Sequence, residues 1–465
     1  MIEKLRKAGI FLYKFAFRGS AARAAAASFA AVILLGAAFL TLPISSSLRH
    51  WTNPVDALFT STSAVCVTGL LVKSTQHHWS LFGQLVILGL IQVGGLGIMT
   101  LGAFVAILIQ RRLSMRFEVV MTDLVEANQV ESVWVLIRFV CLFTLIAEGI
   151  GGIVLFFSWR GDFVSPWTCA YHSVFHAISA FCNAGFSLND SSLMDYADYF
   201  WVNAVVCMLI VFGGIGFVVV RDLKGYLGWW LLVRKGKRPR LSTHSRLVLA
   251  VTGILLLVGF VGVLAMESGG SLAGASVKKK LLAATFQSVT PRTAGFNTVR
   301  MDGLAPATAF LMMALMYIGG SPGSTAGGVK TSTLGIMIAS IVATLKGRPK
   351  AHIFHHSVPS ETVHRVASII LLSVAAIAGG VFLLLITEQG ATFNRIVFDA
   401  ISAFGTVGLS RGLTGPACAM SVWGKLIITA LMFIGRLGPV TLVLSVAHLR
   451  ERAVYDYPEE QIMVG

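Results

Sequence analysis

Phe59-Thr60-Ser61-Thr62-Ser63-Ala64-Val65-Cys66-Val67-Thr68-Gly69-Leu70 is one of four similar stretches in this sequence of 465 residues. Aligned on its glycine, the second copy reads FHAISAFCNAGF (175–186) and the fourth reads FDAISAFGTVGL (398–409). The third copy, FQSVTPRTAGF (286–296), has one residue fewer before its glycine. Successive glycines at 69, 185, 295 and 408 are separated by 116, 110 and 113 residues. Such a period predicts four repeats of a whole structural unit.

A glycine signature follows each of these stretches at a similar distance. It reads GGLG at 94–97, GGIG at 213–216, GGSPG at 319–323 and GRLG at 435–438. Each copy thus has a long apolar segment, a short amphipathic stretch that ends at a glycine, and a second apolar segment with the signature. The glycine-terminated stretch and the glycine signature recur in the same order, so two motifs and not one support the repeat.

The composition is that of a membrane protein. Hydrophobic residues make up 55% of the chain, charged residues only 12%, and the mean hydropathy is +0.79. Soluble domains carry about 25% charged residues, and apolar runs of roughly 20 residues are long enough to cross a bilayer as helices. We predict an all-α polytopic membrane protein with four helix–pore loop–helix repeats, which are eight spanning helices around a central pseudo-fourfold pore.

The net charge of +16 raises the question of a nucleic-acid partner. Lysine and arginine, however, concentrate in the chain ends and in the links between repeats, which hold about twice as many as the segments inside the repeats. That distribution is typical of orientation by the positive-inside rule. We therefore expect no nucleic acid, a cell-membrane location and both termini in the cytoplasm.

The chain divides into an amphipathic cytoplasmic arm, four repeats and a cytoplasmic tail. A signal peptide is the alternative for the start, but the apolar stretch that follows is too long and has no cleavage site. Asn53-Pro54 and Ser165-Pro166 are typical helix starts, and the first of these helices has room for only about ten residues before Gly69, so it should dip into the membrane and return. The second spanning helix is expected at 81–110. The predicted divisions are 1–25, 26–110, 134–220, 246–345, 364–448 and 449–465.

Little in the sequence indicates catalysis or a cofactor. The six cysteines are scattered without ligand spacing, so we interpret them as packing residues. His352, His355 and His356 cluster in one link, where a metal site would lack a nearby cysteine or carboxylate. Neither a nucleotide-binding motif nor an HExxH motif occurs. We expect no enzyme activity and no cofactor in this chain.

The repeated glycines fit an ion filter better than helix packing. Non-helical backbone at membrane depth survives only where protein or a water-filled cavity satisfies it, and four dipping loops can do so by surrounding one axis. Their carbonyl oxygens then replace the hydration shell of a cation, and glycine permits the backbone this requires. Packing by small residues remains the alternative, and suits Gly36 and Gly151. Acids expected at the outer mouth are Asp56, Asp190, Asp195, Asp198 and Asp302.

The filter motifs and the run from Tyr317 to Thr331 (YIGGSPGSTAGGVKT) resemble those of the Trk/Ktr/HKT superfamily of potassium transporters. With one membrane helix before the first filter, the chain is more similar to the KtrB branch than to TrkH. The resemblance implies potassium as the transported ion. In that family, serine at the first filter position accompanies sodium permeation, so a sodium-permeable or Trk-type relative is the alternative. The implied ion-binding residues are Val67, Thr68, Gly69, Asn183, Ala184, Gly185, Thr293, Ala294, Gly295, Thr406, Val407 and Gly408.

Two departures from fourfold symmetry are predicted to form a gate. The glycine-rich run 319–328 cannot remain a regular helix, and the resemblance implies that it is an intramembrane gate loop; a tightly packed kinked helix is the alternative. Arg436 replaces the second signature glycine, and an arginine inside an apolar helix is a candidate functional residue. A salt bridge to Glu148 or Glu267 is its alternative role. The predicted gate residues are Gly319, Gly320, Ser321, Pro322, Gly323, Ser324, Thr325, Ala326, Gly327, Gly328, Lys330 and Arg436.

The resemblance also implies partners. KtrB-like proteins form homodimers on a cytoplasmic KtrA/TrkA-like ring that binds nucleotides, and the basic links 221–245 and 346–363 are candidate docking surfaces for it. Membrane lipids are the remaining expected partner. A non-transport membrane protein is the alternative from a different class, but it leaves the four filter-like loops unexplained.

Overall fold

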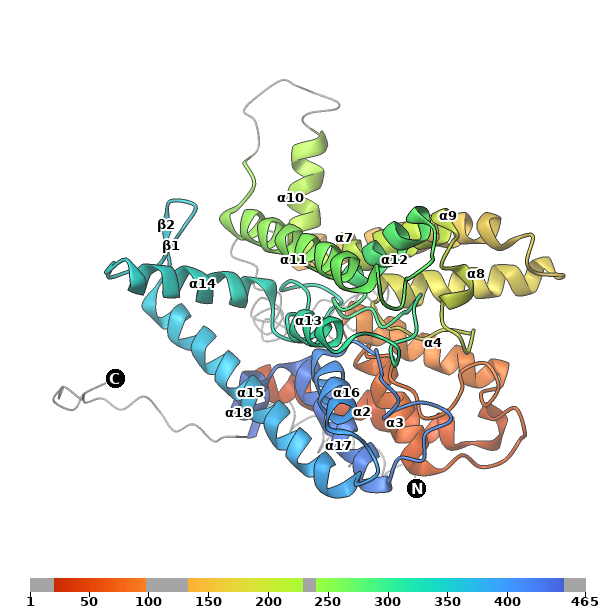
Figure 1. Ribbon diagram of the computed structural model, residues 1–465. Helices are drawn as coiled ribbons and strands as arrows, with labels where there is room; N and C mark the ends of the chain where they lie inside the picture. The colour runs from red at the N-terminus through yellow and green to blue at the C-terminus, as the bar shows by residue number, and fades with distance from the viewer. Residues whose placement is uncertain (1–20, 98–132, 229–239, 447–465) are drawn as a thin grey trace.

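The computed structural model describes residues 21–97, 133–228 and 240–446, whose regular secondary structure is almost entirely helical (Figure 1). The helices that flank the repeated loops or follow the signatures are α2 (Ala21–Thr41), α4 (Leu81–Leu96), α7 (Val133–Trp159), α9 (Phe200–Ile215), α10 (Phe217–Gly228), α11 (Thr243–Glu267), α13 (Pro306–Tyr317), α14 (Thr331–Leu345), α15 (Ser360–Thr387), α17 (Val422–Leu437) and α18 (Pro439–Val446). The short helices that precede the repeated glycines are α3 (Pro54–Val65), α8 (Pro166–Phe181), α12 (Val277–Val289) and α16 (Phe393–Gly405). Two 3-10 turns (Pro43–Ser45 and Met194–Tyr196) and a hairpin of β1 (His352–Ile353) and β2 (His356–Ser357) complete the described part.

Among the described residues, four helices are long and apolar enough to cross a membrane: α2, α7, α11 and α15, or five if the bent pair of α9 and α10 counts as one span. The second helix of each predicted repeat is interrupted at its signature. Helix α4 ends before Gly97 (φ +83°), and the remainder of the helix predicted at 81–110 lies outside the described residues; α9 and α10 meet at Gly216 (φ +98°) with a bend of 103°. Positive φ at the last signature glycine explains the break. The described residues thus show four or five candidate spans, and the eight predicted spanning helices remain a prediction.

The short helices start much as the sequence predicts. Asn53 caps α3 by accepting a hydrogen bond from the Val55 N–H (2.9 Å), with Pro54 in the first turn and Asp56 beside it. Ser165 precedes Pro166 at the start of α8, but the Ser165 side chain makes no capping hydrogen bond. The two helix starts therefore share the proline in the first turn and not the side-chain cap. Each short helix ends just before the loop that carries the repeated glycine.

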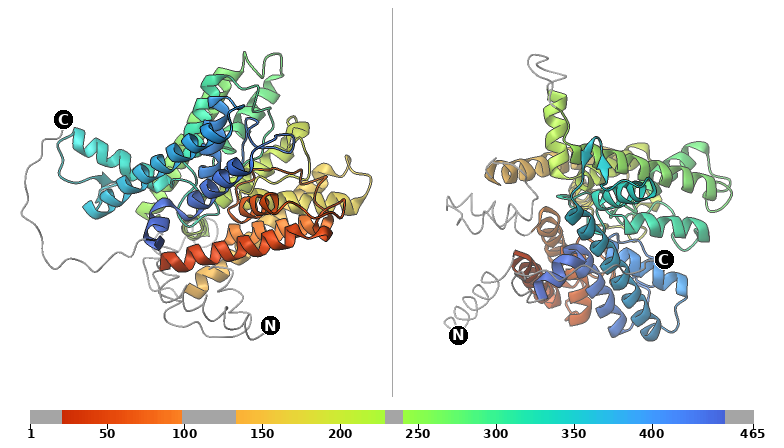
Figure 2. Two further views of the ribbon diagram at one scale, coloured as in Figure 1. Left: turned by 90° about the horizontal axis from the view of Figure 1, so that it is seen from below. Right: turned by 90° about the vertical axis from the view of Figure 1, so that its left-hand side faces the viewer.

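The repeats close into a ring through one recurring contact. The second helix of each repeat packs on the short helix of the next: α4 on α8, α9 on α12, α13 on α16, and α17 back on α3. This cyclic packing directs the C-terminal ends of α3, α8, α12 and α16 toward a common centre. Helix α10 instead projects away from the other helices, as Figure 1 and the right-hand view of Figure 2 show.

Several predicted features lie wholly or largely outside the described residues. These are most of the arm 1–25, the link 111–133, part of the basic link 221–245 and the tail 449–465. All six cysteines are unpaired. Across the described ranges, no three His, Cys, Asp or Glu side chains gather as a metal site would require, and His352, His355 and His356 belong to the hairpin region instead.

Candidate cation filter and gate

The repeated glycines share one backbone conformation. Their φ values are +89° at Gly69, +69° at Gly185, +79° at Gly295 and +95° at Gly408. The residue two positions earlier also has positive φ in every copy: Val67, Asn183, Thr293 and Thr406, between +50° and +69°. Such values are uncommon for non-glycine residues and are an outlier for β-branched valine. The same strained conformation therefore recurs four times, although the sequences of the loops differ.

The four glycines lie side by side around the centre of the ring. A Cβ added to Gly69 would meet the carbonyl oxygen of Ala184, and one on Gly185 would lie 2.8 Å from that of Ala294. The series continues from Gly295 to the carbonyl of Val407, and from Gly408 back to the carbonyl of Thr68. Each glycine thus approaches the carbonyl that precedes the next glycine, so the four loops form a closed circle in which no side chain fits.

Hydroxyl groups hold these loops, a role that the sequence reasoning missed. Ser63 accepts a hydrogen bond from Gly69 N–H (3.0 Å) and donates to Leu70 O (2.8 Å). Ser179 and Thr290 donate to the carbonyls of Phe186 and Phe296, and Ser402 accepts from Gly408 N–H (3.1 Å). The sequence does indicate this role, because a serine or threonine occupies the fifth position of all four aligned stretches.

Behind the loops, the repeats differ in their buried polar contacts. His176 lies 3.0 Å from the Ser187 hydroxyl, and Gln287 donates weakly to Thr298 (3.4 Å). Asp399, at the same position in the fourth repeat, accepts bonds from Ser410 and from the main chain and side chain of Thr414. The first repeat has Thr60, whose hydroxyl bonds only within α3. The loops are therefore supported unequally.

Three threonine hydroxyls in the loops are buried without a protein partner: those of Thr68, Thr293 and Thr406. Thr293 and Thr406 are the residues two positions before the glycine in the third and fourth copies. A buried polar group without a hydrogen bond calls for a specific explanation. Within these loops, such oxygens are available to a ligand that needs oxygen donors.

Above the glycines lies a cavity of about 430 Å³ that all four glycines line. Of the acids predicted at the outer mouth, Asp190 and Asp302 line it, together with Arg300, Arg395 and Arg411. The Arg300 guanidinium donates hydrogen bonds to Asp302 and holds the pKa of that carboxyl below its ordinary value. The entrance is therefore mixed in charge rather than acidic.

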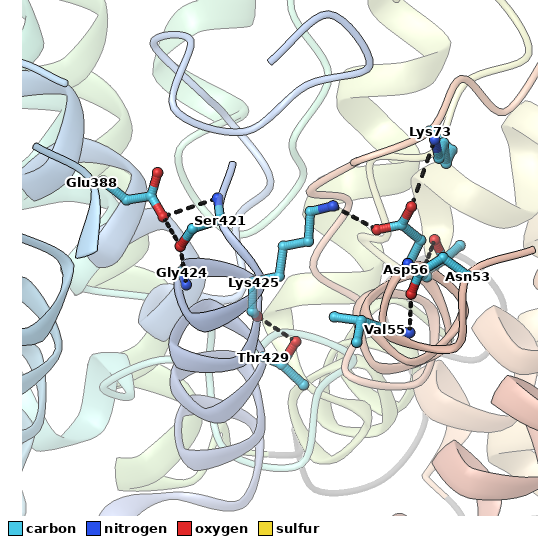
Figure 3. Close-up of polar contacts among 10 residues, drawn as sticks. Asn53, Val55, Asp56, Lys73, Glu388, Ser421, Gly424, Lys425 and Thr429 are labelled. Atoms are coloured by element: carbon cyan, nitrogen blue, oxygen red, sulfur yellow. Dashed lines mark hydrogen bonds and ion pairs between the residues drawn. The ribbon is translucent and has the colours of Figure 1, made fainter. Parts of the chain in front are cut away.

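The remaining predicted acids are elsewhere. Asp195 accepts a hydrogen bond from Ser191, and Asp198 pairs with Lys279 at 3.0 Å, both outside the lining of the cavity. Asp56 is buried at the contact of α3 with α17, where Lys425 lies 2.7 Å and Lys73 3.5 Å from its carboxylate (Figure 3). This ion pair joins the first repeat to the fourth, two repeats that no segment of the chain connects directly, and it therefore helps to close the ring.

The predicted gate loop 319–328 separates α13 from α14 and lies against the filter loops. A Cβ on Gly319 would be 3.3 Å from the Thr293 methyl group, and one on Gly327 would meet the Thr406 side chain. The Thr325 hydroxyl is 3.3 Å from Phe181 O and, with the Asn183 amide turned so that both its ends are satisfied, 3.2 Å from its oxygen. The loop therefore contacts three of the four filter segments.

Main-chain bonds fix this loop to α9. Ser321 and Thr325 donate N–H bonds to the carbonyls of Gly214 and Gly213, at 3.0 and 3.1 Å. Phe217 N–H in turn donates to Gly323 O at 3.0 Å. Lys330, at the end of the run, donates to Ala326 O at 2.6 Å. The segment is thus a folded loop with its own partners and not a kinked helix.

Arg436 is half-buried at the end of α17 and donates to two main-chain carbonyls, those of Thr325 in the loop 319–328 and Gly94 in α4. The alternative of a salt bridge is wrong for both predicted partners. Glu148 accepts from Gln92 (3.1 Å), and Glu267 accepts from the N–H groups of Ser271 and Ala305. Arg436 thus links the loop 319–328 to the first repeat.

Comparison with known families decides the identity. A family model described as TrkH, a cation transport protein, matches residues 16–455. This chain belongs to the TrkH family of cation transport proteins. The potassium/sodium uptake protein NtpJ of Enterococcus hirae is 38% identical over 448 residues, which cover 95% of this chain and 96% of that protein. The Ktr system potassium uptake protein B of Bacillus subtilis is 37% identical, with 95% and 96% covered.

The fold of this TrkH-family chain also matches a solved structure. The potassium transporter TrkH from Vibrio parahaemolyticus superposes with a TM-score of 0.65 at 18% identity, covering 90% of this chain and 84% of that one. The resemblance predicted from the filter motifs is confirmed. The chain is a multi-pass membrane protein of a transporter family and not an enzyme.

Proposed function

We propose that this protein carries potassium across the cell membrane through the circle of Gly69, Gly185, Gly295 and Gly408, with the loop 319–328 as its gate. The observation that carries the proposal is the closed circle of glycines and carbonyls. A ring of carbonyl oxygens is the chemistry that replaces the water around a dehydrated cation. The relatives named as potassium uptake proteins support potassium as the ion.

The strained backbone and the unpartnered hydroxyls support the same site. Positive φ at Val67 and at its three counterparts is the kind of strain that proteins retain at functional sites. The buried hydroxyls of Thr68, Thr293 and Thr406 supply further oxygen atoms beside the carbonyls. We infer that potassium binds to the residues 67–69, 183–185, 293–295 and 406–408.

The helix ends favour a cation there. Helices α3, α8, α12 and α16 all end at the filter loops, and the C-terminal end of a helix carries a partial negative charge. Four such ends around one centre attract positive ions and repel anions. Selection between cations then depends on the spacing of the carbonyls, and the absence of side chains at the four glycines lets the loops approach one another closely.

The gate proposal rests on the position of the loop 319–328 against Thr293, Phe181 and Thr406. A cation leaving the filter toward this side meets the loop and the positive charge of Arg436. Both must rearrange before the ion passes. Because the loop is held by hydrogen bonds rather than by a packed apolar core, two arrangements can differ by only a few kcal/mol.

The rest of the proposal concerns the whole assembly. We propose four repeats within 26–110, 134–220, 246–345 and 364–448 that supply eight membrane crossings, with interrupted second helices and both termini in the cytoplasm. A homodimer on a cytoplasmic nucleotide-binding ring would dock at 221–245 and 346–363. The relatives named as Ktr system proteins support such a regulatory partner. No cofactor is needed, because potassium is the substrate.

Sodium permeation is a second candidate, and one observation favours it. The Enterococcus relative is named as a potassium/sodium uptake protein. Glycine at all four filter positions supports potassium preference instead.

Ion flux into liposomes tests the proposal. Purified protein should carry potassium and rubidium faster than sodium, and an external pulse of each salt with an internal fluorescent indicator reports the rates. Equal rates for potassium and sodium would favour the second candidate. A rate no higher than that of protein-free liposomes would overturn transport itself.

A further inference from the structure

Arg292 is a buried cation that the proposed function does not use. It lies in the third filter loop, three residues before Gly295, and only 7% of it is exposed. The aligned residues in the other copies are Cys66, Cys182 and Gly405, all small. A long charged side chain at this position is therefore peculiar to the repeat that also carries the gate loop.

The contacts of Arg292 are made with main chain and not with an acid. Its Nη2 donates to the Gly319 carbonyl, the first residue of the gate loop, at 3.4 Å, while its Nε is buried without a partner. In the described part of the chain no carboxylate pairs with it. Burying an unpaired charge is costly, so a merely structural arginine is a poor explanation for this position.

A small cavity extends the contact to α11. It has a volume of about 10 Å³, close to the space that one water occupies, and its lining includes Arg292, Gly214 and Thr252. The Thr252 hydroxyl is also buried without a protein partner. One water in this cavity would satisfy both Thr252 and the Nε of Arg292, and would hold the guanidinium against α11.

Gly214 belongs to the same arrangement, because its carbonyl accepts the Ser321 N–H at 3.0 Å. The start of the gate loop is thus fixed twice, at Gly319 by Arg292 and at Ser321 by Gly214. The middle of the loop is held separately, at the Thr325 carbonyl, by Arg436 from the fourth repeat. Two guanidiniums from different repeats hold carbonyls of one loop.

We propose that Arg292 is a positioning residue of the gate: it holds the Gly319 carbonyl so that the start of the loop 319–328 stays in place beneath the filter. Thr252 supports its orientation from α11. This inference rests on the proposed role of the loop as a gate. It predicts that loss of the Arg292 contact favours the open arrangement without altering the filter.

Two variants, Arg292→Met and Arg292→Lys, test the proposal in the full-length protein and in a background in which the loop 319–328 is shortened. Potassium flux, the potassium-to-sodium ratio and the melting temperature are measured in each. In the full-length protein, Arg292→Met should raise flux about tenfold, the order expected for one charged hydrogen bond, and Arg292→Lys should stay near the parent. In the shortened background, Arg292→Met should change flux no further. The potassium-to-sodium ratio should stay constant throughout.

Other outcomes overturn the proposal. A changed potassium-to-sodium ratio in both backgrounds would mean that Arg292 supports the filter and not the gate. Lower flux and lower melting temperature in both variants would mean a structural role. A parent protein without potassium flux would instead overturn the proposed function.

A second pair of variants covers the case in which Arg292→Met does not fold. Thr252→Val removes the hydroxyl at the cavity, and Thr144→Val is the matched control, because it removes another buried hydroxyl without a protein partner, from α7. Flux should rise in Thr252→Val alone. Equal flux in both variants would overturn the proposed coupling of α11 to Arg292.

Discussion

Arg436→Ala is the change that separates an electrostatic barrier from a structural arginine. Its guanidinium donates to the carbonyls of Thr325 and Gly94 and pairs with no carboxylate of the described residues. Truncation would therefore leave two carbonyls without a donor, but no buried charge without a partner. The penalty of about 3–5 kcal/mol for breaking a buried ion pair does not apply.

The gain in flux follows from the lost charge. A unit charge about 6 Å from the ion path, at an effective dielectric constant near 20, contributes about 3 kcal/mol, which is about a hundredfold in rate. Release of the Thr325 carbonyl adds to this effect, because a hydrogen bond from a charged donor contributes about 1.5–3 kcal/mol to holding the loop. We expect potassium flux to rise between tenfold and about a hundredfold.

The assay measures potassium flux in liposomes and the melting temperature in detergent on the same preparation. Arg436→Lys is the control, because it keeps the positive charge, and its flux should stay close to that of the parent. If Arg436→Ala lowers both flux and melting temperature, Arg436 stabilises the fold and the barrier role is refuted.

Three further changes test the gate, the ring and the packing of the filter. Shortening the loop 319–328 should raise potassium flux, and an unchanged flux from a folded protein would contradict its role as a gate. Lys425→Met should lower the melting temperature, because it leaves the buried Asp56 with only Lys73, which is 40% exposed; a melting temperature equal to that of the parent would show that the pair does not fasten the ring. Gly213→Ala places a Cβ against the Phe181 carbonyl and should destabilise by about 1–3 kcal/mol in chemical unfolding, whereas Gly253→Ala, with nothing within 4 Å, is the control and should not.

The recurring loop that carries each glycine could be predicted because its pattern is local and repeats. Glycine at the same place in four repeats predicts a shared backbone conformation, and all four glycines have positive φ. Asn53-Pro54 likewise specifies a helix start without help from tertiary contacts. The breaks at Gly97 and Gly216 were missed. The signatures that contain these two glycines lie within otherwise apolar runs, so the length and hydropathy of each run indicate one continuous helix.

Contacts between repeats could not be predicted from the sequence. Asp56 looked like an acid of the outer mouth, yet its partner Lys425 lies 369 residues away in the chain. Arg436 had two plausible acids in other helices, but it binds carbonyls instead. The contact of Arg292 with the Gly319 carbonyl could not be predicted, because only the folded ring brings Gly319 to the third glycine loop.

The most direct test of the central claim is the potassium-to-sodium flux ratio of Gly69→Ser in liposomes. A side chain at this position would meet the Ala184 carbonyl and lie 3.0 Å from the Gly185 Cα, in a backbone conformation with φ +89° that side chains rarely adopt. Because the circle of carbonyls would have to move, we predict a ratio lowered about tenfold, which corresponds to about 1.4 kcal/mol, while Gly253→Ala keeps the parent ratio. An unchanged ratio in a folded and active Gly69→Ser protein would contradict the assignment of the four glycines as the filter.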